Sequence, residues 1–311
     1  MRPVRLLATA ALAAGALAPP APAQVISPAA DSMLHRIYAS RDFAGETMGP
    51  VVWLPSGDAY TTLDRTSDNP RAHDIVRVDA ATGHRTVLVP AAQLQPPGTT
   101  KPIDVEGYAF SADLDRVLLY TNAQRNWHHG NTRGDYWVLD RHAGSLRKLG
   151  GPDAQPSSLR FAKFSPQGDR VAYVRDNDIY VERLSDGAIT RLTTDGSATI
   201  LNGDADWVDE EELYLRDCFR WSPDGTAIAY WQFDQSGVPV YDIINDTDSL
   251  YPTITPQPYP VPGATNASVR AGVVSAGGGP TTWLQLPGDP RQHYIAYLEW
   301  SGPHELLLQH L

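Results

Sequence analysis

The chain has 311 residues, of which 42% are hydrophobic and 20% are charged. This length and apolar content exclude a disordered chain and allow one large domain or two ordinary ones. The formal net charge is −11, so we expect no nucleic-acid partner, because phosphate backbones repel an acidic surface. The single cysteine, Cys218, excludes an internal disulfide framework and a cysteine-rich zinc site, and we expect it to be a small packing residue.

The first 24 residues have the three parts of a secretory signal peptide. Arg2 and Arg5 precede an apolar run at 6–18, and the segment ends in Ala-Pro-Ala-Gln. The apolar run has about 13 residues, fewer than the roughly 20 that a membrane-spanning helix needs. We therefore predict a signal peptide at 1–24, no membrane anchor after its cleavage, and a periplasmic or secreted mature chain.

A short phrase recurs along the rest of the chain. It starts with an aromatic residue, continues with Ser-Pro-Asp-Gly or a close variant, and is followed by a strand-like run. Proline fixes φ and glycine accepts a positive φ, so the phrase is typical of a tight hairpin turn. The copies lie at residues 53–57, 110–113, 164–168 and 221–225, with a weaker copy at 300–303.

The first four copies are about 55 residues apart, a period that is typical of propellers and solenoids. A second hairpin follows several copies, for example Asp178–Arg183 with Ile189–Leu192. Two hairpins per repeat make a four-stranded blade, so we predict an all-β fold, a β-propeller, with a β-sandwich as the alternative. The proline-rich segment 252–262 indicates an extended connector rather than a strand. The last residues, 306–311, belong to an apolar run, so we expect the propeller to be incomplete.

The densest acidic cluster lies at residues 204–212. Asp206 can cap a short helical turn, from which consecutive glutamates then project. Two long carboxylate side chains can converge on a small cation, and a peptide α-ammonium suits them because carboxylates favour its charged form. A solvated acidic loop and a calcium site are the alternatives, although the register of an EF-hand is not met.

Several motifs together resemble the dipeptidyl peptidase IV family. The phrase Asp206-Trp-Val-Asp-Glu-Glu-Glu-Leu213 is similar to that family's acidic motif and runs into Trp221-Ser-Pro-Asp-Gly225. Two further matches are Asn131-Thr-Arg-Gly-Asp-Tyr-Trp137 and Asn177-Asp-Ile-Tyr-Val181. The resemblance runs from about residue 35 to residue 311. It implies an exported serine exopeptidase that releases N-terminal dipeptides, and it implies that this chain is the propeller that gates substrates and binds their N-terminus.

The resemblance also implies an architecture and site residues. That family's eight-bladed propeller caps an α/β-hydrolase domain, so residues 25–311 would form about five of the expected eight blades, truncated at the C-terminus. The last two glutamates of the acidic motif, Glu211 and Glu212, are implied to hold the substrate's free amine. An arginine of the family holds a substrate carbonyl; His128 occupies that position here, and Arg125 and Arg133 are the neighbouring candidates.

The hydrolase part of that family is not expected in this chain. No Gly-x-Ser-x-Gly nucleophile motif is present, and no β-α-β alternation follows the propeller. Ser222 belongs to a hairpin turn phrase. We therefore expect no catalytic residue, no cofactor and no metal site, and the chain alone should be inactive.

The expected partners are peptides with a free N-terminus and the hydrolase domain of the full-length protein, and the resemblance allows a homodimer. Two alternatives stay open. One is a non-enzymatic periplasmic propeller of the TolB-like kind, acting as a scaffold or binding module. The other is an inactive member of the dipeptidyl peptidase IV family.

Overall fold

The protein is described by a computed structural model that covers residues 26–40, 42–45, 49–66, 72–126 and 130–311; the side chains of 125, 126 and 130–132 are left aside. The predicted signal peptide at 1–24 lies outside the described residues. The chain divides into two compact units, Met1–Met48 and Gly49–Leu311. In the first unit, helix α1 (Pro28–Leu34) begins after the N-cap Ser27, and a π-helical turn (His35–Ala39) continues it.

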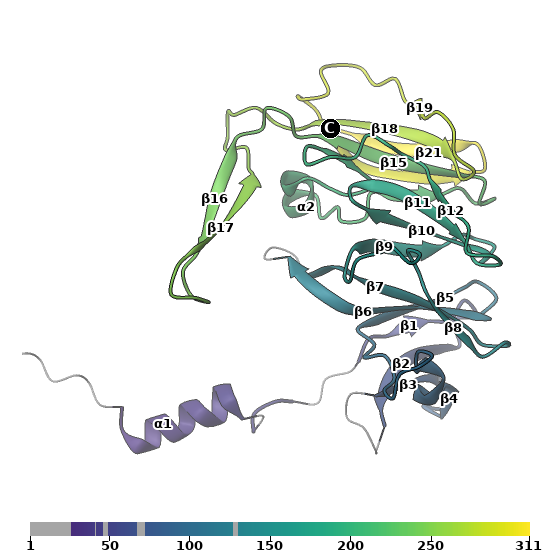
Figure 1. Ribbon diagram of the computed structural model, residues 1–311, viewed down its shortest axis with the longest axis vertical. Helices are drawn as coiled ribbons and strands as arrows, with labels where there is room; N and C mark the ends of the chain where they lie inside the picture. Colours follow the sequence, from purple (N-terminus) through teal and green to yellow (C-terminus); the bar gives the residue numbers. More distant parts are fainter. Residues whose placement is uncertain (1–25, 41, 46–48, 67–71, 127–129) are drawn as a thin grey trace, which may run out of the picture. The chain divides into compact units, whose positions relative to one another are not determined.

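The second unit consists of successive antiparallel sheets (Figure 1). Three four-stranded meanders follow one another along the chain, and a short 3-10 helix, η2 (Ala91–Leu94), follows the first. The first meander is β1 (Val52–Trp53), β2 (Ala59–Arg65), β3 (His73–Asp79) and β4 (Arg85–Val89). The second is β5 (Gly107–Phe110), β6 (Arg116–Asn126), β7 (Gly130–Asp140) and β8 (Ser145–Lys148). The third is β9 (Leu159–Phe164), β10 (Arg170–Arg175), β11 (Asp178–Arg183) and β12 (Ile189–Arg191).

A fourth meander and a final hairpin complete the described strands. The fourth is β14 (Phe219–Trp221), β15 (Ala227–Asp234), β18 (Ser268–Ser275) and β19 (Thr282–Trp283). The short strand β13 (Ile200–Asn202) pairs with the end of β15, and helix α2 (Trp207–Glu212) lies between β13 and β14 in the chain. The hairpin is β20 (Ile295–Gly302) with β21 (Glu305–His310). The all-β prediction with four-stranded blades is therefore confirmed.

Each recurring phrase joins the first two strands of a meander, as predicted. In the fourth copy, the Ser222 Oγ donates a hydrogen bond to Asp224 Oδ1 (2.6 Å) and accepts one from the Ala227 amide (2.9 Å). Gly225 closes the turn with a φ of 67°, a value that costs a residue with a Cβ more than it costs glycine. Ser222 is thus a buried turn residue.

Side chains pack between neighbouring blades, so the core is a series of apolar layers. One layer joins the third blade to the fourth and contains Val174, Ile179, Phe219 and Tyr230. The next joins the fourth blade to the final hairpin, and it includes the predicted packing residue Cys218 together with Trp231. The Trp231 indole is fully buried, and its Nε1–H donates to the Ile295 carbonyl of β20 (2.8 Å).

The second and third meanders also share backbone hydrogen bonds, which makes them one eight-stranded sheet. Strand β7 reaches beyond its own blade and pairs with β9, with Arg133 opposite Arg160 and Gly134 opposite Leu159. At Gly134 a Cβ would lie 2.3 Å from the Tyr120 ring and 2.7 Å from the Thr121 carbonyl. Only glycine allows this close approach, which is why the motif Asn-Thr-Arg-Gly-Asp-Tyr-Trp needs it.

The prediction of a connector at 252–262 is wrong for its first half. Strand β17 (Thr253–Pro258) pairs in register with β16 (Val240–Asn245) and forms a separate two-stranded hairpin. Proline cannot donate to a sheet ladder but is tolerated in an edge strand. Pro256 and Pro258 therefore fit in a two-stranded ribbon, where each strand has a free edge.

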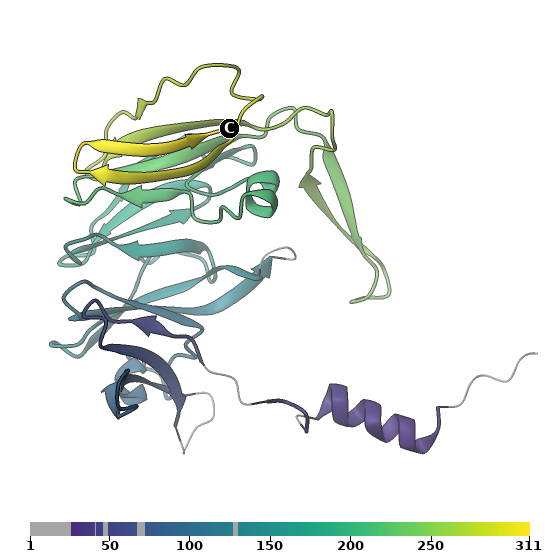
Figure 2. The same cartoon turned by 180° about the vertical axis from the view of Figure 1, so that it is seen from behind.

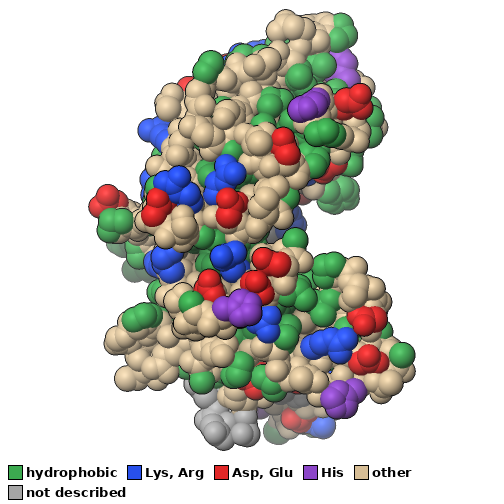
Figure 3. All heavy atoms as spheres, turned by 90° about the vertical axis from the view of Figure 1, so that its right-hand side faces the viewer, with side chains coloured by type: hydrophobic (Ala, Val, Ile, Leu, Met, Phe, Trp, Pro, Cys, Tyr) green, Lys and Arg blue, Asp and Glu red, His purple; other side chains and the backbone are tan. Residues whose placement is uncertain are grey.

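Helix α2, the long ends of β6 and β7, and the β16–β17 hairpin lie on one side of the second unit, as the front and back views both show (Figures 1 and 2). On the face that Figure 3 presents, acidic and basic side chains are interspersed. No helix in the described part of the chain combines the length and hydropathy needed to cross a membrane.

Candidate functional site

The acidic motif folds as helix α2. Asp206 is its N-cap, and the Asp206 Oδ1 accepts a hydrogen bond from the Asp209 amide (2.9 Å), as the sequence predicts. Trp207 anchors the helix from outside, because its ring lies 4.2 Å from that of Tyr259, just after β17. The helix and the hairpin are thus held together by an aromatic contact.

Two carboxyl groups of the motif are buried against each other. Asp206 and Asp209 are only 4% and 3% exposed. Burial raises the pKa of both groups, and the neighbouring Asp206 charge raises that of Asp209 further. The Asp209 Oδ1 has no hydrogen-bond partner among the described residues. The raised pKa means that burial beside Asp206 favours the protonated form of Asp209.

A cavity of about 190 Å³, which we call the acidic cavity, opens beside α2. The Asp204, Asp206 and Glu210 carboxyls line it and face a single guanidinium, that of Arg160. Burial raises the pKa of Glu210 to about 7, although Arg216 and Arg160 pull in the opposite direction. The other lining residues are Asn177, Ala198, Leu201, Ala205, Trp207, Gln235, Gln257 and Pro258. An enclosure with three carboxyls and one guanidinium suits a small cation.

The structure places the predicted amine-binding glutamates at the end of α2. Glu211 is half-buried and Glu212 is exposed. Among the described residues that line the acidic cavity, Glu210 is the glutamate of this triplet. The role of Glu211 and Glu212 stays a prediction.

The predicted carbonyl-binding residues lie at the long end of the β6–β7 hairpin. His128 lies outside the described residues, and for Arg125 only the backbone, in β6, is described. Arg133 is an exposed residue of β7, and its Nη2 donates to Gln124 Oε1 at 3.4 Å. The roles of these three residues stay predictions.

Sequence reasoning missed Arg160, which lies between two cavities. Its Nη1 donates to Asp204 Oδ2 in the acidic cavity, and only 26% of its side chain is exposed. It also lines a second cavity of about 320 Å³, which we call the arginine cavity, together with Arg133, Asp176 and Asn177. The remaining lining residues are Gln124, Gln155, Pro156, Ser157 and Ser158. No local motif marks Arg160, because its neighbour Arg133 is brought to it only by the β7–β9 pairing.

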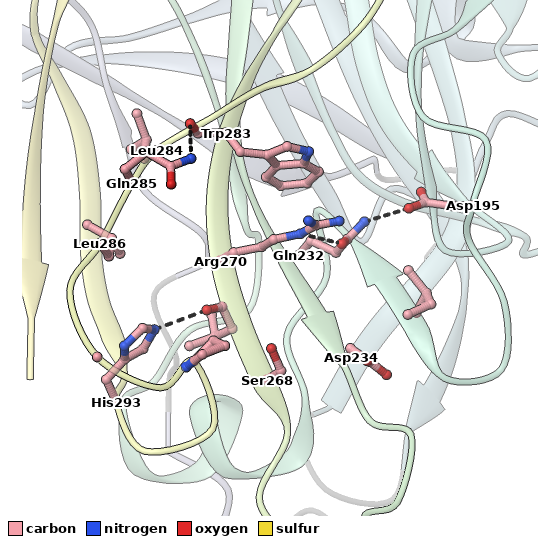
Figure 4. Close-up of a pocket in the computed structure, with 14 residues that line it drawn as sticks. Asp195, Gln232, Asp234, Ser268, Arg270, Trp283, Leu284, Gln285, Leu286 and His293 are labelled. Atoms are coloured by element: carbon pink, nitrogen blue, oxygen red, sulfur yellow. Dashed lines mark hydrogen bonds between the residues drawn. The ribbon is translucent and has the colours of Figure 1, made fainter.

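A further cavity, of about 530 Å³, lies over β15 and β18 under the segment 284–293 (Figure 4). Its central guanidinium, Arg270, stacks 3.6 Å from the Trp283 ring centroid and donates through Nε to Gln232 Oε1 (2.8 Å). The Gln232 amide in turn donates to Asp195 Oδ2 (2.9 Å). None of the residues of the acidic motif lines this cavity, so the candidate site is the acidic cavity with its neighbour.

Among the described residues, no group of three or more histidine, cysteine, aspartate or glutamate side chains is arranged to hold a metal ion. The donors of the acidic cavity are carboxyls and amides set beside one guanidinium, rather than a convergent ligand set.

The successive four-stranded blades define this chain as an all-β propeller region, with the acidic helix α2 beside a polar cavity. The profile of the dipeptidyl peptidase IV (DPP IV) N-terminal region matches residues 111–311, and the chain belongs to that family. The resemblance drawn from the motifs is thereby confirmed.

Individual relatives agree with this assignment. Dipeptidyl aminopeptidase B of Saccharomyces cerevisiae is 32% identical over 214 residues, 67% of this chain and 25% of that protein. The inactive dipeptidyl peptidase 10 of Rattus norvegicus is 32% identical over 232 residues, 73% of this chain and 28% of that protein. The crystal structure of Porphyromonas gingivalis dipeptidyl peptidase 4 superposes with a TM-score of 0.76 at 27% identity, covering 88% of this chain and 38% of that one. The chain thus spans well under half the length of each of these relatives.

Proposed function

We propose that this chain is the substrate-gating and N-terminus-binding propeller region of an exported dipeptidyl peptidase IV-like serine exopeptidase. Family membership supports the peptidase assignment, since the relatives are dipeptidyl peptidases. The signal-peptide pattern at 1–24 supports export to the periplasm or outside the cell. Catalysis would come from a hydrolase domain of the full-length protein.

The observation that carries the proposal is the acidic cavity beside α2. A peptide α-ammonium has a pKa near 8, and neighbouring carboxylates favour its charged form. Glu210 lines the cavity, and Glu211 follows it on the same short helix. We propose that Glu211 and Glu212, with Glu210 beside them, bind the free amine, and that Arg125, His128 or Arg133 contacts a carbonyl of the same peptide.

The test compares single variants of the full-length protein. Glu211→Gln and Glu212→Gln should each raise KM and lower kcat/KM for dipeptidyl substrates, because each removes a charge from the amine site. A charge-assisted hydrogen bond contributes about 1.5–3 kcal/mol, so kcat/KM should fall roughly ten- to a hundredfold. Glu305→Gln on β21 is the control, since Glu305 is exposed and far along the chain from α2. Kinetics of both α2 variants equal to those of the control would refute the assigned roles.

A binding role without catalysis is the second candidate. The observation that favours it is a relative that is itself named an inactive dipeptidyl peptidase. Peptide binding without hydrolysis by the full-length protein would select this candidate, whereas dipeptide release would exclude it. The expected homodimer stays a prediction that sedimentation velocity of the protein tests.

A further inference from the structure

Two arginines face each other across the join between the second and third blades. Arg133 on β7 and Arg160 on β9 are directly opposite residues of an antiparallel pair. Like charges at such positions destabilise a sheet, because their side chains lie on the same face a few ångströms apart. The repulsion is felt at Arg160, where burial and the Arg133 charge lower its pKa to about 10. The register thus brings two guanidinium groups to neighbouring positions of one sheet.

Much of the donor capacity of the pair is unused. Arg160 gives its Nη1 to Asp204, while its Nε and Nη2 have no hydrogen-bond partner among the described residues. Arg133 makes one long hydrogen bond, from Nη2 to Gln124 Oε1 at 3.4 Å. Guanidinium groups offer planar donor pairs that match a carboxylate. Both groups line the arginine cavity, so the remaining donors border an enclosed space.

The cavity around these donors is polar. Its charged lining residues are Arg133, Arg160 and the exposed Asp176, so two guanidinium groups border it beside one carboxylate, and Arg160 is also ion-paired with Asp204. Asp204, the partner of Arg160, belongs to the acidic cavity instead. Three non-glycine residues of the lining have a positive φ: Ser157 (53°), Asp176 (50°) and Asn177 (60°). Asp176 and Asn177 form the two-residue turn between the paired residues Arg175 and Asp178, where a positive φ at both positions is ordinary hairpin geometry.

We propose that the arginine cavity binds a carboxylate of the peptide whose amine enters the acidic cavity. The two cavities adjoin, because Arg160 and Asn177 line both. The acidic cavity offers carboxyls to a cation, and the arginine cavity offers guanidinium groups to an anion. This inference rests on the proposed function and names its substrate class: short peptides with a carboxylate near the free amine. It differs from a carbonyl contact, which requires one donor rather than two neighbouring guanidinium groups.

Four versions of one tripeptide separate the two cavities. Ala-Ala-Ala is used with a free or acetylated amine and with a free or amidated carboxyl end, and its affinity for the 311-residue chain is measured by calorimetry. Arg133→Gln is the principal variant, because Arg133 is exposed and its loss should not disturb folding. Arg183→Gln is the matched control, since Arg183 is an exposed arginine that pairs with Asp186 in a turn. Arg160→Gln, checked for its fold by circular dichroism, is the second variant.

The expected result is a loss that depends on the carboxylate alone. Arg133→Gln should weaken binding of the acetylated acid roughly tenfold more than binding of the acetylated amide, because a lost carbonyl contact affects both peptides alike, and Arg183→Gln should change neither. Sodium acetate and inorganic phosphate, titrated alone, should bind more weakly than the acetylated acid. The proposal is overturned if the acetylated acid does not bind at millimolar concentration, if Arg133→Gln and Arg183→Gln behave alike, or if acetate or phosphate binds as well as the peptide.

The proposed amine site and the proposed carboxylate site can be refuted separately. Glu210→Gln should weaken the peptides with a free amine and leave the acetylated acid unchanged. If Glu210→Gln has no effect while Arg133→Gln weakens the acetylated acid, the amine assignment is wrong and the carboxylate site stands. The reverse pattern removes the carboxylate site and leaves the proposed function in place.

Discussion

Binding of a peptide amine to the acidic cavity should depend on pH through Glu210. Burial raises the pKa of this carboxyl from its usual 4.5 to about 7. At pH 5 about one Glu210 in a hundred is then ionised, against about nine in ten at pH 8. Because only the ionised form attracts an ammonium ion, affinity should rise as pH increases through 7. Above about pH 8 the peptide amine loses its own proton, so affinity should fall again.

The change in the ionised fraction of Glu210 limits the rise in affinity for the peptide amine to roughly a hundredfold between pH 5 and pH 8. Part of the Glu210 side chain is open to solvent, and water screens the charge, so a rise of about tenfold is the lower limit. The assay is calorimetric titration of the chain with amidated Ala-Ala-Ala from pH 5 to pH 9 at constant ionic strength. Glu210→Gln should abolish the rise between pH 5 and pH 8. A rise of equal size in that variant, or a flat profile in the unaltered protein, would show that the reasoning about Glu210 is wrong.

Three further predictions concern stability. The raised pKa of Glu210 means that the folded chain holds this proton more tightly than the unfolded chain. The contribution of Glu210 to the free energy of unfolding is therefore full below about pH 4.5 and is lost as pH rises to about 7. The free energy of urea unfolding should differ less between pH 5 and pH 8 in Glu210→Gln than in the unaltered protein, and an unchanged difference would contradict this. Trp231→Phe removes the donor to Ile295 and should lower the free energy of unfolding by about 1–3 kcal/mol, measured by urea unfolding followed by circular dichroism. The control Trp53→Phe, at a site 58% exposed, should lower it by under about 0.5 kcal/mol. Equal losses in the two variants would contradict the prediction. Gly134→Ala should lower the free energy of unfolding by about 1–3 kcal/mol, because the new Cβ would overlap the Tyr120 ring. Gly107→Ala, whose Cβ would lie 3.7 Å from the same tyrosine, should lower it less. The opposite order would contradict the close approach at Gly134.

The blades could be predicted because each turn is determined by a few residues that are adjacent in the sequence. In each copy an aromatic residue ends one strand and a serine–aspartate turn starts the next, so a few adjacent residues determine the hairpin. The N-cap at Asp206 is equally local, since it depends on a donor three residues away. Family resemblance then implied that the acidic motif binds a peptide amine, whereas spacing alone left an amine site, a solvated loop and a calcium site open.

What could not be predicted depends on contacts between distant segments. Arg160 lies beside Arg133 only because β9 pairs with β7, and the sequence of neither strand predicts that pairing register. The burial that raises the pKa of Glu210 comes from the folded surroundings of α2 rather than from the motif. The β16–β17 hairpin was missed because prolines normally argue against a strand, and an isolated ribbon escapes that rule.

The backbone pairing between β7 and β9 has a consequence for how the molecule opens. Elsewhere in the described unit, neighbouring blades meet mainly through apolar side chains, with one backbone hydrogen bond from the Asn202 amide to the Asn177 carbonyl (3.0 Å) between the third blade and β13. Such side-chain layers can separate without breaking a ladder. Across the β7–β9 join, amide groups of two blades protect one another, so these blades should exchange their hydrogens with solvent as a single foldon. The arginine pair then lies within this slowly exchanging unit.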